Sequence, residues 1–192
     1  MRWPASRRSS VTGDVTVICG PTAVGKGTIV RAVAAAHPEV WVSVSATTRA
    51  PRPTEVDGVD YLFVTEAEFD ELVGTDGLLE WAAVHTTRYG TPAEPVRRAV
   101  AAGRKVILEI DVQGARQVRQ TMPEARFIFI EPPSMAELRA RLAKRGTETE
   151  AQVAVRLKTA EAEMAAKGEF EHLIVNDDLG LAVSDLLHFM GL

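Results

Sequence analysis

Residues 20–28, which read Gly-Pro-Thr-Ala-Val-Gly-Lys-Gly-Thr, constrain the fold of this chain more than any other stretch. They follow an apolar run typical of a strand and precede an apolar-periodic run typical of a helix. In this setting the pattern G-x-x-x-x-G-K is typical of loops that bind nucleotide phosphates. Gly20 and Gly25 permit backbone angles that a side chain would forbid, so successive N–H groups can surround a phosphate. The alternative interpretation is an ordinary glycine-rich turn between a strand and a helix.

Lys26 is the candidate catalytic residue of this loop, because its mobile ammonium group can contact two phosphates at once. The helix that begins here adds its positive N-terminal end to the same site. The residue after this lysine usually supplies a hydroxyl group to Mg²⁺, but it is Gly27 in this chain, and Thr28 follows it. The loop therefore predicts nucleotide binding and leaves the protein ligand of the magnesium ion open.

Composition narrows the class of protein. At 192 residues the chain fits one domain with room for inserted lobes. A net charge of −4 argues against a nonspecific nucleic-acid-binding protein, which would be basic. The one cysteine, Cys19, excludes an internal disulfide, fits a reducing compartment and is expected to be buried in the first strand. No apolar run reaches the roughly 18 residues that span a membrane, so we expect a cytoplasmic protein.

Strand-type and helix-type runs alternate along most of the chain. Apolar runs at 15–19, 40–45, 105–111, 125–130 and 172–175 predict the strands of a buried parallel sheet. This alternation predicts an α/β fold of the P-loop NTPase type, with a parallel sheet flanked by helices. Residues 46–91 interrupt it with short strand-type pieces, a turn at 89–92 and one helix that starts at the capping box Thr65–Glu68. This segment predicts a small α+β lobe inserted into the core.

A helix–break–helix arrangement late in the chain predicts a lid. One helix ends before Gly146 and another capping pattern follows at 147–150. We interpret Arg141, Arg145 and Arg156 as lid cations that a hinge at Gly146 moves. The expected organisation is a flexible tail at 1–13 and one domain at 14–192, with its core at 14–45 and 92–192, the lobe at 46–91 and the lid at about 144–158.

Two polar features of the lobe are candidates for ligand contacts. Arg49 and Arg52 lie in a loop stiffened by prolines, which is either a solvated loop or a rigid grip on one phosphate. Glu80 interrupts the apolar run 78–84. Because a buried carboxylate is costly unless it is paired, Glu80 needs a partner or a ligand.

Two acidic residues end the strand predicted at 105–111. Glu109 and Asp111 project to the same side, since side chains alternate along a strand. They lie at the carboxyl end of the strand, where open α/β sheets bind their ligands. Asp111 is alternatively the cap of the helix that follows, and we favour a role in the cleft.

These segments, taken in order from about residue 15 to residue 192, resemble guanylate kinase. The resemblance rests on the phosphate loop and on further motifs at 45–52, 55–61, 80–82, 89–91, 109–114, 132–134, 145–149 and 175–176. It implies a kinase of three parts, an ATP-binding core, a GMP-binding lobe and a lid, which phosphorylates GMP and dGMP to the diphosphates. Motifs this numerous and this ordered are specific, whereas the phosphate loop alone is not.

The resemblance also implies the roles of individual residues. The GMP phosphate is expected to contact Arg49, Arg52, Tyr61 and Tyr89, and the guanine side is expected to contact Ser45, Glu80, Thr91 and Asp111. ATP is expected to contact Gly20, Pro21, Thr22, Ala23, Val24, Gly25, Lys26, Gly27, Thr28, Arg141 and Asn176. The transferring phosphoryl group is expected to be neutralised by Lys26, Arg145 and Arg156.

The chemistry of guanine makes independent sense of these residue types. Guanine presents its N1–H and 2-amino groups as adjacent donors, and the carboxylate of Glu80 can accept from both. Hydroxyl groups of Ser45 and Thr91 can donate to guanine O6. Adenine offers an acceptor at N1 and has no 2-amino group, so a site of this kind would reject it.

The resemblance departs from the family at Gly27, where a serine or threonine is usual. We therefore expect Mg²⁺, bound with ATP, to be held mostly through water and phosphate oxygens, with Thr28, Glu109 or Asp111 as outer contacts. Two alternatives remain at this point. One is another nucleoside monophosphate kinase, because the Gly-Lys-Gly-Thr order resembles adenylate kinase. The other is a non-catalytic guanylate-kinase-like module that binds a phosphorylated peptide. Neither nucleic acid nor a membrane is an expected partner.

Overall fold

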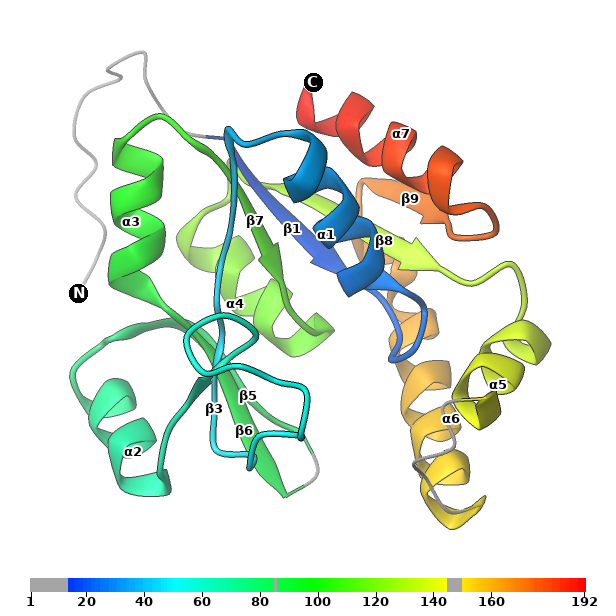
Figure 1. Ribbon diagram of the computed structural model, residues 1–192, viewed down its shortest axis with the longest axis horizontal. Coiled ribbons are helices and arrows are strands. Elements are labelled where there is room, and N and C mark those ends of the chain that lie inside the picture. The colour runs from blue at the N-terminus through cyan, green and yellow to red at the C-terminus, as the bar shows by residue number, and fades with distance from the viewer. Residues whose placement is uncertain (1–13, 85, 145–149) are drawn as a thin grey trace.

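The computed structural model describes residues 14–84, 86–144 and 150–192, and its central element is a parallel sheet (Figure 1). Among these residues, five strands pair in the order β2-β7-β1-β8-β9, and every pair is parallel. The strands are β1 (Val15–Cys19), β2 (Val40–Val42), β7 (Lys105–Glu109), β8 (Arg126–Glu131) and β9 (His172–Val175). The α/β class with a parallel sheet, predicted from the alternation of runs, is confirmed.

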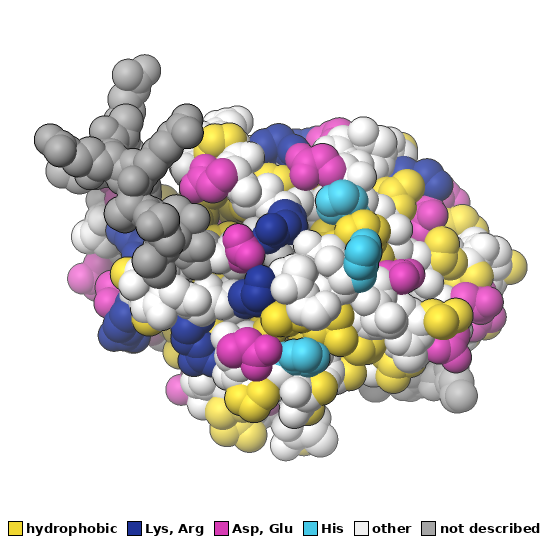
Figure 2. All heavy atoms as spheres, turned by 90° about the horizontal axis from the view of Figure 1, so that it is seen from above, with side chains coloured by type: hydrophobic (Ala, Val, Ile, Leu, Met, Phe, Trp, Pro, Cys, Tyr) yellow, Lys and Arg dark blue, Asp and Glu magenta, His cyan; other side chains and the backbone are white. Residues whose placement is uncertain are grey.

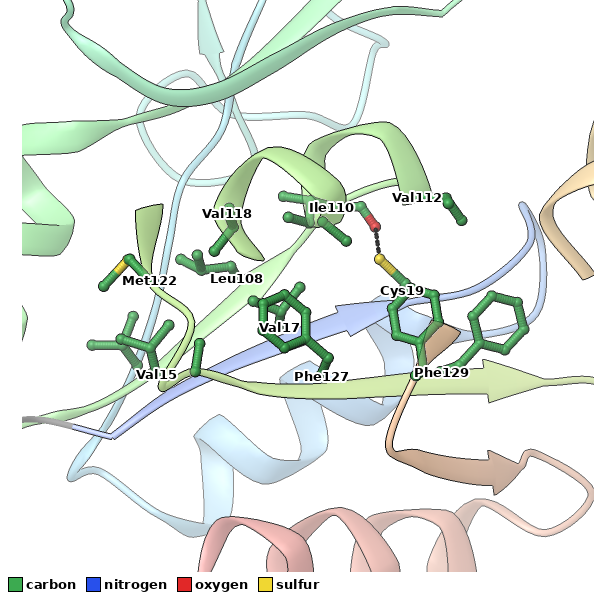
Figure 3. Packing of buried hydrophobic residues seen from close by; sticks show 14 of the residues in the cluster. Val15, Val17, Cys19, Leu108, Ile110, Val112, Val118, Met122, Phe127 and Phe129 are labelled. Atoms are coloured by element: carbon green, nitrogen blue, oxygen red, sulfur yellow. Dashed lines mark hydrogen bonds between the residues drawn. The ribbon is translucent and has the colours of Figure 1, made fainter. Parts of the chain in front are cut away.

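The centre of the sheet is mostly apolar, and helices cover both of its faces. On one face, α1 (Lys26–Ala36) and α7 (Leu179–Met190) pack against Ile18, Ile107 and Ile128. On the other, α3 (Ala93–Ala101) and α4 (Val112–Thr121) pack against the alternate side chains, and Figure 3 shows Val17 and Phe127 in this cluster.

Cys19 belongs to the second of these clusters, as predicted. It is fully buried, and its thiol lies 3.3 Å from the carbonyl oxygen of Ile110, a weak hydrogen bond drawn in Figure 3. Burial raises the pKa of the Cys19 thiol, so this residue is an inert core side chain.

A second, smaller sheet is inserted between α1 and α3 in the chain. Among the described residues its strand order is β4-β3-β6-β5, formed by β3 (Ala46–Thr47), β4 (Leu62–Phe63), β5 (Leu78–Val84) and β6 (Thr87–Pro92). One helix, α2 (Glu66–Gly74), accompanies it at the lower left of Figure 1. The predicted capping box opens this helix, since Thr65 and Glu68 exchange side-chain-to-backbone hydrogen bonds.

The turn predicted at 89–92 is wrong, because these residues belong to β6. Gly90 and Thr91 pair with Trp81 and Glu80 of the antiparallel neighbour β5. A Cβ atom on Gly90 would lie 2.9 Å from the Leu78 side chain and 3.0 Å from a backbone oxygen. The glycine therefore marks a close approach inside a strand, which resembles a turn signal in sequence.

Two further strands differ from prediction in extent. The strand expected at 40–45 ends at Val42, and the loop expected from residue 46 begins with the short strand β3. The N–H of Thr48 still donates to the carbonyl oxygen of Arg88 in β6, and the pairing has ended before the two prolines at 51 and 53, which have no N–H group to donate to a sheet.

Between β8 and β9 the chain forms α5 (Met135–Lys144), α6 (Glu150–Ala165) and the 3₁₀ turn η1 (Lys167–Glu169). The hydroxyl of Ser134 accepts a hydrogen bond from the N–H of Glu137 at 3.1 Å, which is one half of the predicted cap of α5. Gly146, Arg145 and the third predicted cap lie outside the described residues.

The face of the molecule seen in Figure 2 carries basic, acidic and histidine side chains intermixed with apolar ones. Within the described ranges, no helix has both the length and the apolar character that crossing a membrane requires.

Candidate active site

One polar cavity of about 830 Å³ lies where the glycine-rich loop, the carboxyl end of β7, the second sheet and α6 meet. It collects most of the residues that were predicted from separate stretches of the chain. The predicted residues that line it are Thr22, Ala23, Gly25, Lys26, Gly27, Thr28, Ser45, Arg49, Arg52, Tyr61, Glu80, Tyr89, Glu109, Asp111 and Arg156. Gly20, Pro21, Val24, Thr91, Arg141 and Asn176 do not line it, and Arg145 lies outside the described residues.

The glycine-rich loop requires glycine at two positions. Gly20 and Gly25 have φ angles of 143° and 102°, which L side chains rarely adopt. A Cβ atom would lie 2.2 Å from the carbonyl oxygen of Ile130 at Gly20, and 2.4 Å from Nδ2 of Asn176 at Gly25. No side chain caps the start of α1 at Gly25, and the N–H of Thr28 already donates to the carbonyl oxygen of Gly25. The N–H groups of Lys26 and Gly27 are therefore the ones in the first helical turn that can bind an anion.

Lys26 folds back over this loop. Its Nζ donates hydrogen bonds to the carbonyl oxygens of Gly20 at 2.5 Å and Pro21 at 3.2 Å. The ammonium group thus stays beside the concavity, held by neutral partners that a phosphate can replace at little cost.

Asn176 and Arg141 hold the backbone of the loop without lining the cavity. The amide of Asn176 donates to the carbonyl oxygen of Val24 at 2.7 Å, and Arg141 donates to the carbonyl oxygen of Asn176 at 3.0 Å. These contacts connect α5 and the end of β9 to the loop. Both residues were predicted to touch ATP, and in this structure they fix the backbone of the loop.

Glu80 is the buried carboxylate of the cavity, with 4% of its surface exposed. Thr91, opposite it in the sheet, donates its hydroxyl proton to Oε1 of Glu80 at 2.6 Å. Burial raises the pKa of Glu80 to about 7, the Thr91 hydrogen bond opposes the rise and the charge of Asp111 adds to it. The partner that this carboxylate needs is thus Thr91, whose proton points at Glu80 rather than into the cavity.

Gly114 makes room for the same carboxylate. A Cβ atom at Gly114 would lie 2.3 Å from Oε2 of Glu80 and 2.9 Å from its Cδ. The second oxygen of Glu80 therefore occupies the space that a side chain on α4 would fill.

Asp111 caps the helix that follows it and also lies in the cavity, so the two interpretations weighed for it do not exclude each other. Its Oδ1 accepts a hydrogen bond from the N–H of Gly114 at 2.7 Å and caps α4, and the residue also lines the cavity. Glu109 lies nearer the loop, with its carboxylate oxygens 3.5 and 3.7 Å from the point where a Cβ atom of Gly27 would stand.

The two arginines of the proline-stiffened loop, Arg49 and Arg52, both contact Glu55. Arg49 makes a two-pronged ion pair with Glu55 at 2.9 Å for each contact, and Glu55 also contacts Arg52. Arg49 lies over the ring of Tyr61, which in turn packs edge-on against Tyr89 with ring centres 6.0 Å apart. The cavity end formed by these side chains suits an anion with several oxygens.

Several lining residues were not predicted. Glu55 could have been predicted, because an acidic residue three positions after Arg52 is a candidate partner for the arginines of that loop. Arg31 lies one turn after Gly27, and its Nη1 would lie 3.3 Å from a Cβ atom there.

Glu163 on α6 is a further residue that the sequence interpretation missed. Arg156, Thr159 and Glu163 line the cavity together because their spacing of three and four places them on one helix face. One carboxylate oxygen of Glu163 is buried without a hydrogen-bond partner. Burial raises the pKa of Glu163, while the charge of Lys26 opposes the rise.

A glycine-rich loop between β1 and α1, with a polar cavity at the carboxyl ends of parallel strands, defines a nucleotide-binding enzyme of the P-loop class. The family model for guanylate kinase matches residues 12–191. The chain is 56% identical to guanylate kinase of Cutibacterium acnes over 98% of its own length and 96% of the relative's. It is also 56% identical to guanylate kinase of Nocardia farcinica, over 91% of its own length and 92% of the relative's.

A solved structure gives the same family. The crystal structure of guanylate kinase from Anaplasma phagocytophilum matches with a TM-score of 0.78 and 30% identity, covering 94% of this chain and 86% of that chain. The chain therefore belongs to the guanylate kinase family, and the resemblance noted from its motifs is confirmed.

Proposed function

We propose that this chain transfers the terminal phosphoryl group of ATP to GMP, giving ADP and GDP. The observation that carries the proposal is that one cavity holds both Lys26 of the glycine-rich loop and the buried carboxylate Glu80 of the lobe. Donor and acceptor nucleotides bound at its two ends would present their phosphates to each other. Transfer can then be direct, since phosphoryl transfer requires positioning and charge neutralisation but no covalent intermediate on the protein.

The acceptor end fits GMP in both its base and its phosphate. Charged Glu80 accepts from guanine N1–H and the 2-amino group, Thr91 orients it, and Ser45 donates to O6. The phosphate is held by Arg49, Arg52, Tyr61 and Tyr89, in which the tyrosines add hydrogen bonds without adding charge.

The donor end fits the phosphates of ATP. Backbone N–H groups of residues 20–28 surround them, and Lys26 leaves its carbonyl partners to contact the transferring group. Arg156 from α6, together with Arg145, neutralises the remaining charge when residues 144–158 act as a lid. Closure excludes water, which would otherwise hydrolyse ATP. We place this reaction in the cytoplasm.

Magnesium fits this site as a companion of ATP. Within the described part of the chain, no group of three or more acidic, histidine or cysteine side chains is placed to hold a metal ion. Mg²⁺ commonly keeps several waters and binds through phosphates and one or two carboxylates, which Glu109 beside Gly27 can satisfy. Glu109 and Asp111 would hold the hydrated ion, with Thr28 nearby, and the ion would neutralise phosphate charge.

Replacing Gly114 with alanine should weaken GMP binding selectively. The new methyl group would displace the carboxylate of Glu80, and overpacking of this kind costs roughly 1–3 kcal/mol, or about tenfold in KM for GMP. The helix itself should tolerate alanine, which is a better helix former than glycine. Steady-state kinetics should show a raised KM for GMP with KM for ATP unchanged.

The control for this variant is Gly74→Ala, since a Cβ atom on Gly74 would meet nothing within 4 Å. It should leave both KM values as they are. An equal rise in KM for GMP in the two variants would contradict the assignment of Glu80 to the base.

A coupled assay of ADP release across GMP, dGMP, AMP, CMP and UMP tests the proposed function. We expect kcat/KM for GMP and dGMP to exceed that for AMP by at least about a hundredfold, because the buried carboxylate would be left unpaired by adenine. Activity should require added Mg²⁺. Preferred turnover of AMP would identify another nucleoside monophosphate kinase instead. Binding of a phosphorylated peptide without turnover of any nucleotide would identify an interaction module.

A further inference from the structure

Arg49 is held by one edge of its guanidinium group. Such a group can form paired hydrogen bonds through two different edges, one carrying Nη1 and Nη2 and the other carrying Nε and Nη2. Glu55 occupies the first edge, with Nη1 donating to Oε2 and Nη2 donating to Oε1, each at 2.9 Å. The remaining N–H of Nη1 donates to the carbonyl oxygen of Ala50 at 2.7 Å.

The second edge of Arg49 has an unsatisfied donor. Its Nε is buried and has no hydrogen-bond partner. A buried N–H without an acceptor carries a free-energy cost that an incoming oxygen atom would remove. The pKa of Arg49 is raised mainly by its hydrogen bonds to Glu55, and further by a hydrogen bond to the Tyr89 side chain, so Tyr89 contacts the same guanidinium group. The free edge thus belongs to the same neighbourhood as a tyrosine proposed to bind phosphate.

Glu55 also fixes the second arginine of the loop. Its Oε2 accepts from the backbone N–H of Arg52 at 2.7 Å, and its Oε1 lies 3.3 Å from Nη1 of Arg52. The Glu55 side chain is 11% exposed and the Arg49 side chain 18% exposed, so solvent screens the pair less than a surface ion pair. One carboxylate therefore sets the geometry of both arginines.

We propose that Glu55 is a positioning residue for the acceptor phosphate. Glu55 holds Arg49 by the edge that carries Nη1 and Nη2, and so leaves the edge that carries Nε and Nη2 for two phosphate oxygens. This inference rests on the proposed function, since it takes GMP as the acceptor. It differs from a placeholder role, in which the carboxylate would occupy the phosphate position and compete with GMP. A placeholder would take the edge that is left free.

Glu55→Gln tests the proposal through binding of GMP and guanosine, which share the base and differ in the phosphate. By isothermal titration calorimetry, the variant should bind GMP roughly tenfold more weakly, because it loses a charge-assisted pair that orients Arg49. Guanosine should bind as it does to the unchanged protein. In kinetics, KM for GMP should rise by the same factor, with KM for ATP unchanged.

The matched control is Glu66→Gln. Glu66 pairs with Arg88 in the same lobe, away from the cavity lining, so its variant should bind GMP normally. In an Arg49→Lys background, which lacks the paired edge, Glu55→Gln should weaken GMP binding by less than about threefold, because only the contacts of Glu55 with Arg52, whose side chain is 58% exposed, remain to be lost. Glu55→Asp keeps the charge on a shorter side chain, so its affinity for GMP should lie between those of the unchanged protein and Glu55→Gln. It provides a second variant if Glu55→Gln does not fold.

Three results would overturn the inference. One is tighter GMP binding by Glu55→Gln, which would identify a competing carboxylate. Another is an equal loss for GMP and guanosine in Glu55→Gln or Glu55→Asp, which would identify general damage to the lobe. The third is a full effect of Glu55→Gln in the Arg49→Lys background. Failure of the unchanged protein to bind or phosphorylate GMP would instead overturn the proposed function, so the two failures are distinguishable.

Discussion

Replacing Lys26 with alanine is expected to lower kcat for GDP formation by about a thousandfold or more. The ammonium group of Lys26 donates to the carbonyl oxygens of Gly20 and Pro21, beside the loop concavity. No other side chain of residues 20–28 carries a charge that could replace it. The backbone cradle does not depend on Lys26, so ATP should still bind, and the distant Glu80 should still bind GMP normally.

Initial rates and separate titrations of the two nucleotides measure this prediction. Lys167→Ala is the control, because Lys167 is paired with Glu131 at 2.8 Å and does not line the cavity. Its kcat should match that of the unchanged protein. A normal kcat in Lys26→Ala would show that the loop does not bind the transferring phosphate.

Glu80→Gln is expected to lower kcat/KM for GMP by about a hundredfold, since it removes two charge-assisted acceptors from the base. The maximal rate should change less, because the base is remote from the transferring phosphate. Selectivity for GMP over AMP should fall accordingly. An unchanged ratio of the two efficiencies would show that Glu80 does not recognise the base.

The same residue should give GMP binding a pH dependence. With the pKa of Glu80 raised to about 7, protonation below that pH leaves an O–H group where guanine needs an acceptor. The kcat/KM for GMP should therefore fall roughly tenfold per pH unit below about pH 7. The second ionisation of the GMP phosphate, near pH 6, affects both proteins equally. The ratio of the unchanged protein to Glu80→Gln therefore isolates Glu80, and a ratio independent of pH would contradict this assignment.

Stability should change with pH in the opposite direction. The folded protein keeps a proton on Glu80 that the unfolded chain releases above about 4.5, so the contribution of Glu80 is most favourable below that pH. It is lost as the pH rises through about 7, by roughly 3 kcal/mol in the free energy of unfolding. Urea denaturation should thus show Glu80→Gln gaining stability over the unchanged protein at pH 8 and much less at pH 4.5. Equal differences at both values would contradict the raised pKa.

The glycine-rich loop could be predicted from sequence because its chemistry is local. The spacing of Gly20, Gly25 and Lys26 within a strand–loop–helix setting carries the geometry without reference to distant residues. Glu80 was also recognisable, since a carboxylate in an apolar strand must find a partner. The identity of that partner was not, because Thr91 faces Glu80 only through the register of β5 and β6.

The remaining residues of the cavity depend on how separate elements are brought together. Glu163 enters from α6, more than a hundred residues after Lys26, and no local pattern links the two. The sequence shows that Glu55 is an acidic residue near two arginines. Which edge of Arg49 it binds depends on side-chain geometry and could not be predicted from the sequence. The turn expected at Gly90 failed for the opposite reason, since a local signal was overridden by pairing across the sheet.

The most direct test of the account follows the terminal phosphate of ATP itself. A single turnover with ATP labelled at the γ-phosphate, Mg²⁺ and GMP should place the label in GDP, with none on the protein. Replacing GMP with AMP should leave the label in ATP. Label recovered as inorganic phosphate in the presence of GMP, or bound covalently to the chain, would contradict direct transfer between two nucleotides in one cavity.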